Sequence, residues 1–297
     1  MIDKLGKALY IIEIERTKGE EQQTMTNDTE RDDVLTATTV SGRPATVGRP
    51  AVAKRGAPTI VFVHGAFSDH HSFDGWVRRF AEAGYHTLAV SMRGRLGIGP
   101  ERAAGLTFAD YVDDTLAVLD ELSQPPIIVG HSLGGLIAQR LASWGHARAI
   151  ALLASAPAAT LTAQAIALPR FAPNMPRIMT GKPFIVGNGA CSVLALNRVP
   201  EAARPAIHAH LTHESGKVYR SMMLGTIRVN AADVGVPVFV AGGVDDRIVS
   251  TRLVRKTARH YGVEPRLYPD HGHWIVGEPG WEHVADDVLA WLGANDL

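Results

Sequence analysis

The feature that most constrains the fold is a series of short, continuously apolar segments. They lie at 59–63, 87–90, 126–129, 149–153 and 236–240. Strands that are buried on both faces have this pattern, and the stretches between them have helical periodicity. The sequence therefore predicts an α/β fold, with a mostly parallel central sheet flanked by helices. Residues 34–53 are expected to add an antiparallel hairpin at the sheet edge.

One connection is much longer than the others. About 80 residues separate the segments 149–153 and 236–240, whereas roughly 2–6 residues is typical of a connection. Several prolines interrupt short helical patterns in this stretch. We therefore expect a helical lid at 158–228, inserted into a core formed by 34–157 and 229–297.

The N-terminal residues 1–33 are mostly polar and are expected to be a disordered tail or an extension. Either Met1 or Met25 could be the start of the protein. An apolar run at 8–12 is interrupted by Glu13 and is shorter than a signal-peptide core, so a cytoplasmic location is expected.

Composition argues against several partners. Lys+Arg and Asp+Glu both number 30, so the formal net charge is zero and neither nucleic acid nor an anionic membrane is an expected partner. No run approaches the roughly 20 apolar residues of a membrane span. Cys191 is the single cysteine, which excludes an intrachain disulfide and a cysteine-based metal cluster.

A G-x-S-x-G motif follows the third apolar segment. It reads Gly130-His131-Ser132-Leu133-Gly134, and the helical pattern after it ends at Gly145. The residues expected on the buried face of that helix are Leu133, Leu136, Ile137, Leu141 and Trp144. A serine on so sharp a turn has a strained backbone, and small residues two positions away leave room for neighbouring chain. The turn also places the hydroxyl at a helix N-terminus, which favours negative charge.

On this motif the chain resembles the α/β-hydrolase superfamily, over roughly residues 34–292. Three further segments stand where that family has functional loops: His-Gly-Ala-Phe at 64–67, Gly-Val-Asp-Asp-Arg-Ile-Val at 243–249 and His-Gly-His-Trp at 271–274. Each follows a predicted strand, the last of them at 264–268. The resemblance implies an α/β-hydrolase fold with Ser132 as the nucleophile.

By this resemblance, the oxyanion hole consists of the backbone N–H groups of Ala66 and Leu133. These residues follow the His-Gly pair and the nucleophile. Phe67 is the alternative to Ala66, because the loop geometry could shift the donor by one residue. The side chain of His64 is expected to tie the loop down and to transfer no proton.

The resemblance also selects His273, in a Gly-His-aromatic pattern, as the general base, and His271 is expected to shape the loop. Asp246 fits the position of the acid when the pattern is counted from Gly243, and Asp245 fits it when the pattern is counted from Gly242. The chain order Ser132, Asp246, His273 is that of this fold and differs from the order in chymotrypsin-like and subtilisin-like enzymes.

These expectations describe an esterase-like serine hydrolase that acts through an acyl-enzyme on a small to medium apolar carboxylic ester, thioester or lactone. Apolar lid residues either line its pocket or pack the lid onto the core: Leu168, Phe171, Met175, Ile178, Met179, Phe184, Met222, Met223 and Leu224. The same motifs would also suit a C–C bond hydrolase, an amidase, a cofactor-free perhydrolase or a hydroxynitrile lyase. A non-catalytic small-molecule receptor is the alternative from another class.

No metal or organic cofactor is expected. His208, His210 and His213 form a His-x-His-x-x-His pattern in the lid, but their spacing does not match a helical His-Glu-x-x-His site, so a solvated helix face is expected. The glycine-rich stretch 93–99 does not open a G-x-G-x-x-G helix, so dinucleotide binding is not expected. The sequence does not predict the oligomeric state.

Overall fold

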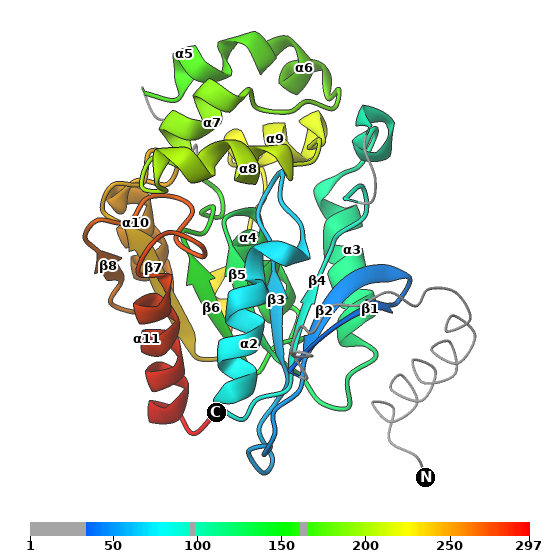
Figure 1. Ribbon diagram of the computed structural model, residues 1–297, viewed down its shortest axis with the longest axis vertical. Helices are drawn as coiled ribbons and strands as arrows, with labels where there is room; N and C mark the ends of the chain where they lie inside the picture. The colour runs from blue at the N-terminus through cyan, green and yellow to red at the C-terminus, as the bar shows by residue number, and fades with distance from the viewer. Residues whose placement is uncertain (1–33, 96–98, 161–165) are drawn as a thin grey trace, which may run out of the picture.

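An eight-stranded sheet forms the centre of the molecule, in the order β1-β2-β4-β3-β5-β6-β7-β8 (Figure 1). The computed structural model describes residues 34–95, 99–160 and 166–297, so the predicted tail at 1–33, with Met25, lies outside the described residues. The strands are Leu35–Val40 (β1), Arg43–Gly48 (β2), Ile60–Val63 (β3), Thr87–Val90 (β4), Ile127–His131 (β5), Ala149–Leu153 (β6), Val238–Gly243 (β7) and Arg266–Tyr268 (β8).

The strand pairing confirms the predicted sheet. β3 to β8 run parallel to one another, whereas β1 and β2 form an antiparallel hairpin at the edge, next to β4. Every apolar segment predicted as a buried strand is one. The last strand, β8, has three residues and is shorter than the predicted 264–268.

Helices cover both faces of the sheet. They are α2 (Asp74–Glu82) and α11 (Trp281–Ala294) on one face, and α3 (Phe108–Leu119), α4 (Leu133–Ser143) and α10 (Thr251–His260) on the other (Figure 1). Successive strand side chains point to opposite faces. Ile60 and Phe62 therefore pack in the cluster with α2 and α11, and Val61 and Val63 in the cluster with α3, α4 and α10.

One detail of the helix after the motif was predicted wrongly. Trp144 is 51% exposed and does not face the core. The helix α4 already ends at Ser143, and the Arg140 guanidinium lies over the Trp144 ring, 5.5 Å from its centroid. Gly145 follows with a φ of 81°, as expected of a residue that ends a helix.

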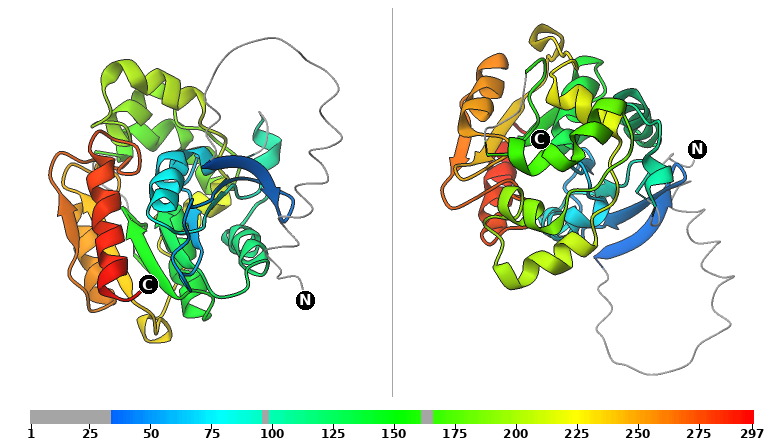
Figure 2. Two further views of the ribbon diagram at one scale, coloured as in Figure 1. Left: turned by 60° about the horizontal axis from the view of Figure 1, so that its bottom comes forward. Right: turned by 90° about the horizontal axis from the view of Figure 1, so that it is seen from above.

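The long connection between β6 and β7 forms a layer of helices. They are α5 (Leu168–Phe171), α6 (Met175–Thr180), α7 (Asn188–Leu194), α8 (Arg204–Ala209) and α9 (Gly216–Met223). Figures 1 and 2 show this layer, here called the helical insertion, over the carboxyl ends of the sheet strands. The two stems of the insertion meet, because the N–H of Ala159 donates to the carbonyl oxygen of Ile227 at 2.8 Å. Its boundaries at 158–228 and its action as a lid stay predictions.

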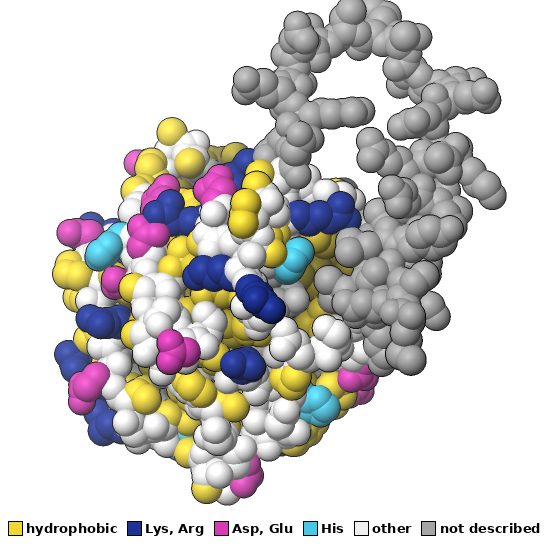
Figure 3. All heavy atoms as spheres, turned by 90° about the horizontal axis from the view of Figure 1, so that it is seen from below, with side chains coloured by type: hydrophobic (Ala, Val, Ile, Leu, Met, Phe, Trp, Pro, Cys, Tyr) yellow, Lys and Arg dark blue, Asp and Glu magenta, His cyan; other side chains and the backbone are white. Residues whose placement is uncertain are grey.

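The face opposite the insertion shows no single sign of charge. Lys and Arg side chains are interspersed there with Asp, Glu and apolar ones (Figure 3). Within the described ranges, no helix combines the length and the apolar character that crossing a bilayer requires.

Candidate active site

Ser132 lies at the turn between β5 and α4, where the backbone is strained. Its φ of 51° and ψ of −113° are unusual for a residue with a side chain. A Cβ at Gly130 would overlap the carbonyl oxygen of Gly134, and a Cβ at Gly134 would overlap that of Val63. The two glycines therefore allow this turn, which holds the serine hydroxyl at the N-terminus of α4.

The Ser132 hydroxyl is one end of a chain of hydrogen bonds. It donates to Nε2 of His273 at 3.0 Å, and the Nδ1–H of the same ring donates to Oδ2 of Asp246 at 2.9 Å. The second carboxylate oxygen of Asp246 accepts the N–H groups of Ile248 and Val249 at 2.7 and 2.8 Å, which fix its orientation. This arrangement can move a proton from the hydroxyl to the imidazole while the carboxylate holds the ring.

Asp245 and His271, the alternatives to Asp246 and His273, have other hydrogen-bond partners. Asp245 accepts a hydrogen bond from Nε of Arg198 at 2.9 Å, and its side chain is 36% exposed. His271 donates through Nδ1–H to the carbonyl oxygen of Pro269 at 3.0 Å. Of the two aspartates, the structure therefore brings Asp246 to the His273 ring.

His131, directly before the serine, supports the backbone of the base. Its Nε2–H donates to the carbonyl oxygen of His273 at 2.8 Å. Burial, together with the nearby His273, lowers the pKa of His131 to about 3. The ring is therefore neutral at physiological pH, which leaves a single N–H for this hydrogen bond.

A second buried network, which the sequence analysis missed, joins the helical insertion to the loop at 64–67, here called the oxyanion loop. Arg95 and Glu214 form an ion pair of 2.5 Å, and both side chains are fully buried. Glu214 also accepts the Tyr111 hydroxyl at 2.7 Å and the Phe67 N–H at 3.4 Å. The Thr212 N–H donates to the carbonyl oxygen of Phe67 at 2.7 Å. The Arg95–Glu214 network thus holds the Phe67 residue through both its N–H and its carbonyl.

This network separates the two candidates for the first oxyanion donor. The Phe67 N–H is directed to Glu214, whereas the N–H groups of Ala66 and Leu133 donate to no other described residue. The loop also packs directly on the serine, because a Cβ at Gly65 would lie 3.3 Å from Cβ of Ser132. Ala66 and Leu133 are therefore the donors that could receive an oxyanion formed beside the hydroxyl.

His64 ties the oxyanion loop to the end of β4. Its Nε2 accepts the N–H of Met92 at 3.1 Å, so its Nδ1–H donates to the carbonyl oxygen of Gly65 at 2.8 Å. Burial, followed by the charge of Arg95, lowers the pKa of His64 well below its usual value, so the ring is neutral. This is the structural role expected from the sequence. His70 is likewise engaged, with Nδ1 2.7 Å from the Ser91 hydroxyl.

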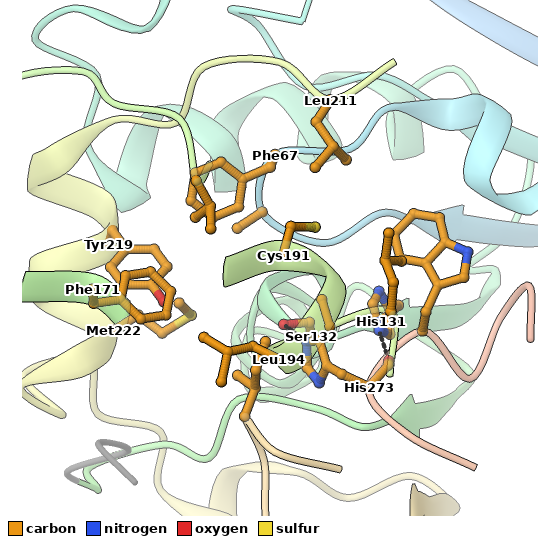
Figure 4. Close-up of a pocket in the computed structure, with 16 residues that line it drawn as sticks. Phe67, His131, Ser132, Phe171, Cys191, Leu194, Leu211, Tyr219, Met222 and His273 are labelled. Atoms are coloured by element: carbon orange, nitrogen blue, oxygen red, sulfur yellow. Dashed lines mark hydrogen bonds between the residues drawn. The ribbon is translucent and has the colours of Figure 1, made fainter. Parts of the chain in front are cut away.

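Ser132 opens onto two adjoining apolar pockets. The first, shown in Figure 4, lies between the oxyanion loop, α7 and α9, with Phe67, Cys191, Leu194 and Trp274 among its lining residues. The second lies against α5 and α6, with Leu168 and Met175 among its lining residues. Both pockets share Ser132, Phe171, Tyr219, Met222 and Ile248. An apolar molecule in either pocket would contact the hydroxyl.

Only some of the insertion residues that were candidates for the pocket lining contact a pocket. Those that line a pocket are Leu168, Phe171, Met175, Met222 and Met223. Ile178 and Phe184 are buried and line neither pocket, in agreement with the packing alternative, whereas Met179 and Leu224 are 48% and 45% exposed and also line neither. Short helices bury only part of their surface, and the sequence pattern did not show which part.

Cys191, Tyr219 and Trp274 line the first pocket and were not predicted to do so. Only Trp274, next to His273, stood in a motif that could have revealed it. His208, in the histidine pattern of α8, donates through Nε2–H to the carbonyl oxygen of Val186 at 2.8 Å. Among the described residues, no three side chains of the metal-binding kinds lie together.

Comparison with known proteins shows which families and folds this chain is similar to. The model of the alpha/beta hydrolase family matches residues 60–283. A monoacylglycerol lipase of Mycolicibacterium smegmatis is 27% identical over 255 residues, which are 78% of this chain and 87% of that one. The crystal structure of the Paleococcus ferrophilus monoacylglycerol lipase is 22% identical, with a TM-score of 0.65 over 83% of this chain and 97% of that one. A carboxylesterase structure from Nitrososphaera gargenis is 19% identical, with a TM-score of 0.63 over 88% and 100%.

Proposed function

The chain belongs to the alpha/beta hydrolase family, and from that premise we propose that it is a serine hydrolase of apolar carboxylic esters. Small to medium esters, thioesters and lactones form the substrate class. Relatives that are named monoacylglycerol lipase and carboxylesterase support an ester as the bond that is cleaved. The apolar lining of both pockets supports an apolar acyl or alcohol group.

The proposed reaction has two halves. His273 takes the proton of the Ser132 hydroxyl, whose oxygen attacks the acyl carbonyl, while Asp246 stabilises the imidazolium that forms. The N–H groups of Ala66 and Leu133 stabilise the oxyanion, at about 3–4 kcal/mol per donor in comparable sites. His273 then protonates the leaving alcohol, and water hydrolyses the acyl-enzyme by the same steps.

One observation carries the proposal: the unbroken hydrogen-bond chain from Asp246 through His273 to Ser132, which ends at the floor of an apolar pocket. A serine that served structure alone would not need a buried, carboxylate-oriented imidazole beside it. Nor would it need two neighbouring backbone N–H groups that donate to no described residue. The helical insertion supplies much of the pocket wall, which supports its proposed action as a lid.

Covalent labelling tests the nucleophile. A fluorophosphonate probe should label the wild-type protein and not Ser132→Ala, with the label found on the peptide that contains residue 132. Ser192→Ala, which changes a partly exposed serine on α7 that lines neither pocket, is the matched control and should keep the label. Labelling of Ser132→Ala at the wild-type rate would refute the assignment.

Turnover tests the reaction. A series of p-nitrophenyl esters of increasing acyl length should be hydrolysed with a burst of one equivalent of p-nitrophenol when deacylation is slow. Binding of the esters without release of p-nitrophenol would instead favour the receptor. Thioesters and lactones of matched chain length then define the range of acyl groups.

A further inference from the structure

Tyr219 stands on α9 at the boundary between the two pockets and lines both of them. Its ring is fixed from three sides, with centroid distances of 5.7 Å to Phe67, 5.3 Å to Phe171 and 5.1 Å to Phe184. In Figure 4 it lies with Phe171 and Met222 on the side of the pocket away from His273. The hydroxyl therefore has a fixed place in the space that a substrate would fill.

The Tyr219 hydroxyl differs from those of the other described tyrosines. Each of those has a hydrogen-bond partner: Leu297 for Tyr85, Glu214 for Tyr111, Gln139 for Tyr261 and Asp287 for Tyr268. Within the part of the chain that the structure describes, the Tyr219 hydroxyl has none, although the residue is buried. Its oxygen is not among the fully enclosed polar atoms that lack a partner, so it is accessible from the pockets that Tyr219 lines. A tyrosine with a buried ring usually places its hydroxyl against a hydrogen-bond partner. A bound molecule could therefore supply the hydrogen-bond partner of this hydroxyl.

The surroundings of the phenol define that partner. Burial, followed by the charge of Glu214, raises the pKa of Tyr219, so the hydroxyl stays protonated and can donate. Among the described residues, no Lys, Arg, Asp or Glu lines either pocket, so an anionic group would lose its hydration there without gaining a countercharge. The group that suits the Tyr219 hydroxyl is therefore an uncharged oxygen that accepts a hydrogen bond and belongs to an otherwise apolar molecule.

We propose that the Tyr219 hydroxyl binds a carbonyl, ether or hydroxyl oxygen of the substrate, at a site distinct from the scissile ester group. This inference rests on the proposed ester hydrolysis and narrows its substrate class to apolar esters that carry a second, uncharged oxygen. A substrate with a methylene at that position would leave the hydroxyl unpaired, so the site selects against it.

Esters of equal length test the proposal. The probes are p-nitrophenyl decanoate and its oxo derivatives, with the keto group moved stepwise along the acyl chain. For the wild-type protein, kcat/KM should be about tenfold higher for the best-placed oxo ester than for the plain ester. In Tyr219→Phe, which keeps the ring, this ratio should fall to about one. Equal ratios in the two proteins, as expected if the hydroxyl contacts only water, would overturn the proposal.

Two controls separate the possible failures. Tyr268→Phe removes a hydroxyl that is bonded to Asp287 at 2.8 Å, outside both pockets, and should keep the wild-type ratio. The same oxo and plain chains, as methyl esters, are also measured by Kd in Ser132→Ala and in Ser132→Ala/Tyr219→Phe. The oxo preference should appear in the first protein alone, and its absence there would overturn the role of Tyr219. Failed turnover with this preference intact would refute only the hydrolysis.

Discussion

Two buried polar networks meet at the oxyanion loop, and they are built in opposite ways. The chain Ser132–His273–Asp246 comes from loops at the carboxyl ends of the core strands β5, β7 and β8. The Arg95–Glu214 network joins the core to the helical insertion and ends on Phe67. The first leaves one oxygen open to the pocket, whereas the second holds the loop that contains Ala66, the proposed oxyanion donor. The proposed reactive groups therefore come from the core, whereas the contact that holds this loop depends on the insertion.

The largest effect is expected within the first network, whose members act as a unit. Ser132→Ala and His273→Ala should each lower kcat for a p-nitrophenyl ester by about a million-fold, and the double variant should be no slower than either. The reason is that neither group moves the proton without the other. Steady-state kinetics with circular dichroism to verify folding would check this. A double variant that is much slower than both single variants would show independent roles.

Asp246 and Asp245 offer a neighbouring pair with different expected effects. Asp246→Asn should lower kcat by about ten-thousandfold, because an amide no longer fixes the imidazole tautomer or stabilises its charge. Asp245→Asn removes only an exposed ion pair with Arg198 and should change kcat by about twofold at most. Steady-state measurement of kcat for both variants above pH 7 compares the two effects. Similar losses in the two would refute the choice of the acid.

The second network should affect stability and alignment together. Glu214→Leu leaves Arg95 buried without its partner, so the free energy of unfolding should fall by about 3–5 kcal/mol. Arg95→Met/Glu214→Leu should regain most of that stability in urea unfolding. Its kcat should remain about tenfold below wild type, with a smaller change in KM, because the oxyanion loop has lost its anchor.

A surface ion pair provides the control for this network. Arg79→Met breaks the pair with Asp286, in which both side chains are partly exposed, and should cost about 1 kcal/mol or less. If the double variant of Arg95 and Glu214 has the wild-type kcat, the second network stabilises the fold and does not position the loop.

The smallest effect concerns pH. His131 is neutral in the folded protein because its pKa is lowered to about 3, whereas in the unfolded chain it is about 6.5. Between these values the unfolded state binds the proton and the folded state does not, so stability falls as the pH falls. The loss from this residue should reach about 2 kcal/mol at pH 5. His131→Asn should lose that much less between pH 7 and pH 5 in urea unfolding, and an unchanged pH dependence would contradict this.

The first network was predictable because its parts stand in local motifs. Ser132, His273 and Asp246 each follow a predicted strand, and parallel strands bring their carboxyl ends to one edge of the sheet. The strands themselves were visible as continuous apolar runs. The choice between Asp246 and Asp245 required coordinates, because both side chains follow the same strand.

The second network was hidden for a physical reason. Arg95 stood in a glycine-rich stretch and Glu214 beside a histidine pattern, and nothing in either segment predicts that the two charges are buried against each other. Such a contact depends on how the insertion packs on the core. Short helices carry little periodicity, so Tyr219, Met179 and Leu224 were equally hard to place.

The meeting of the insertion stems at Ala159 and Ile227 has a consequence for how such chains diversify. A segment whose two ends lie side by side can be exchanged for another without rethreading the strands that frame it. Such a transplant would change the walls of both pockets while Ser132 keeps its place at the end of β5. It would also discard Glu214, so a grafted segment must bring its own carboxylate to meet Arg95, or that arginine must be replaced in the same step.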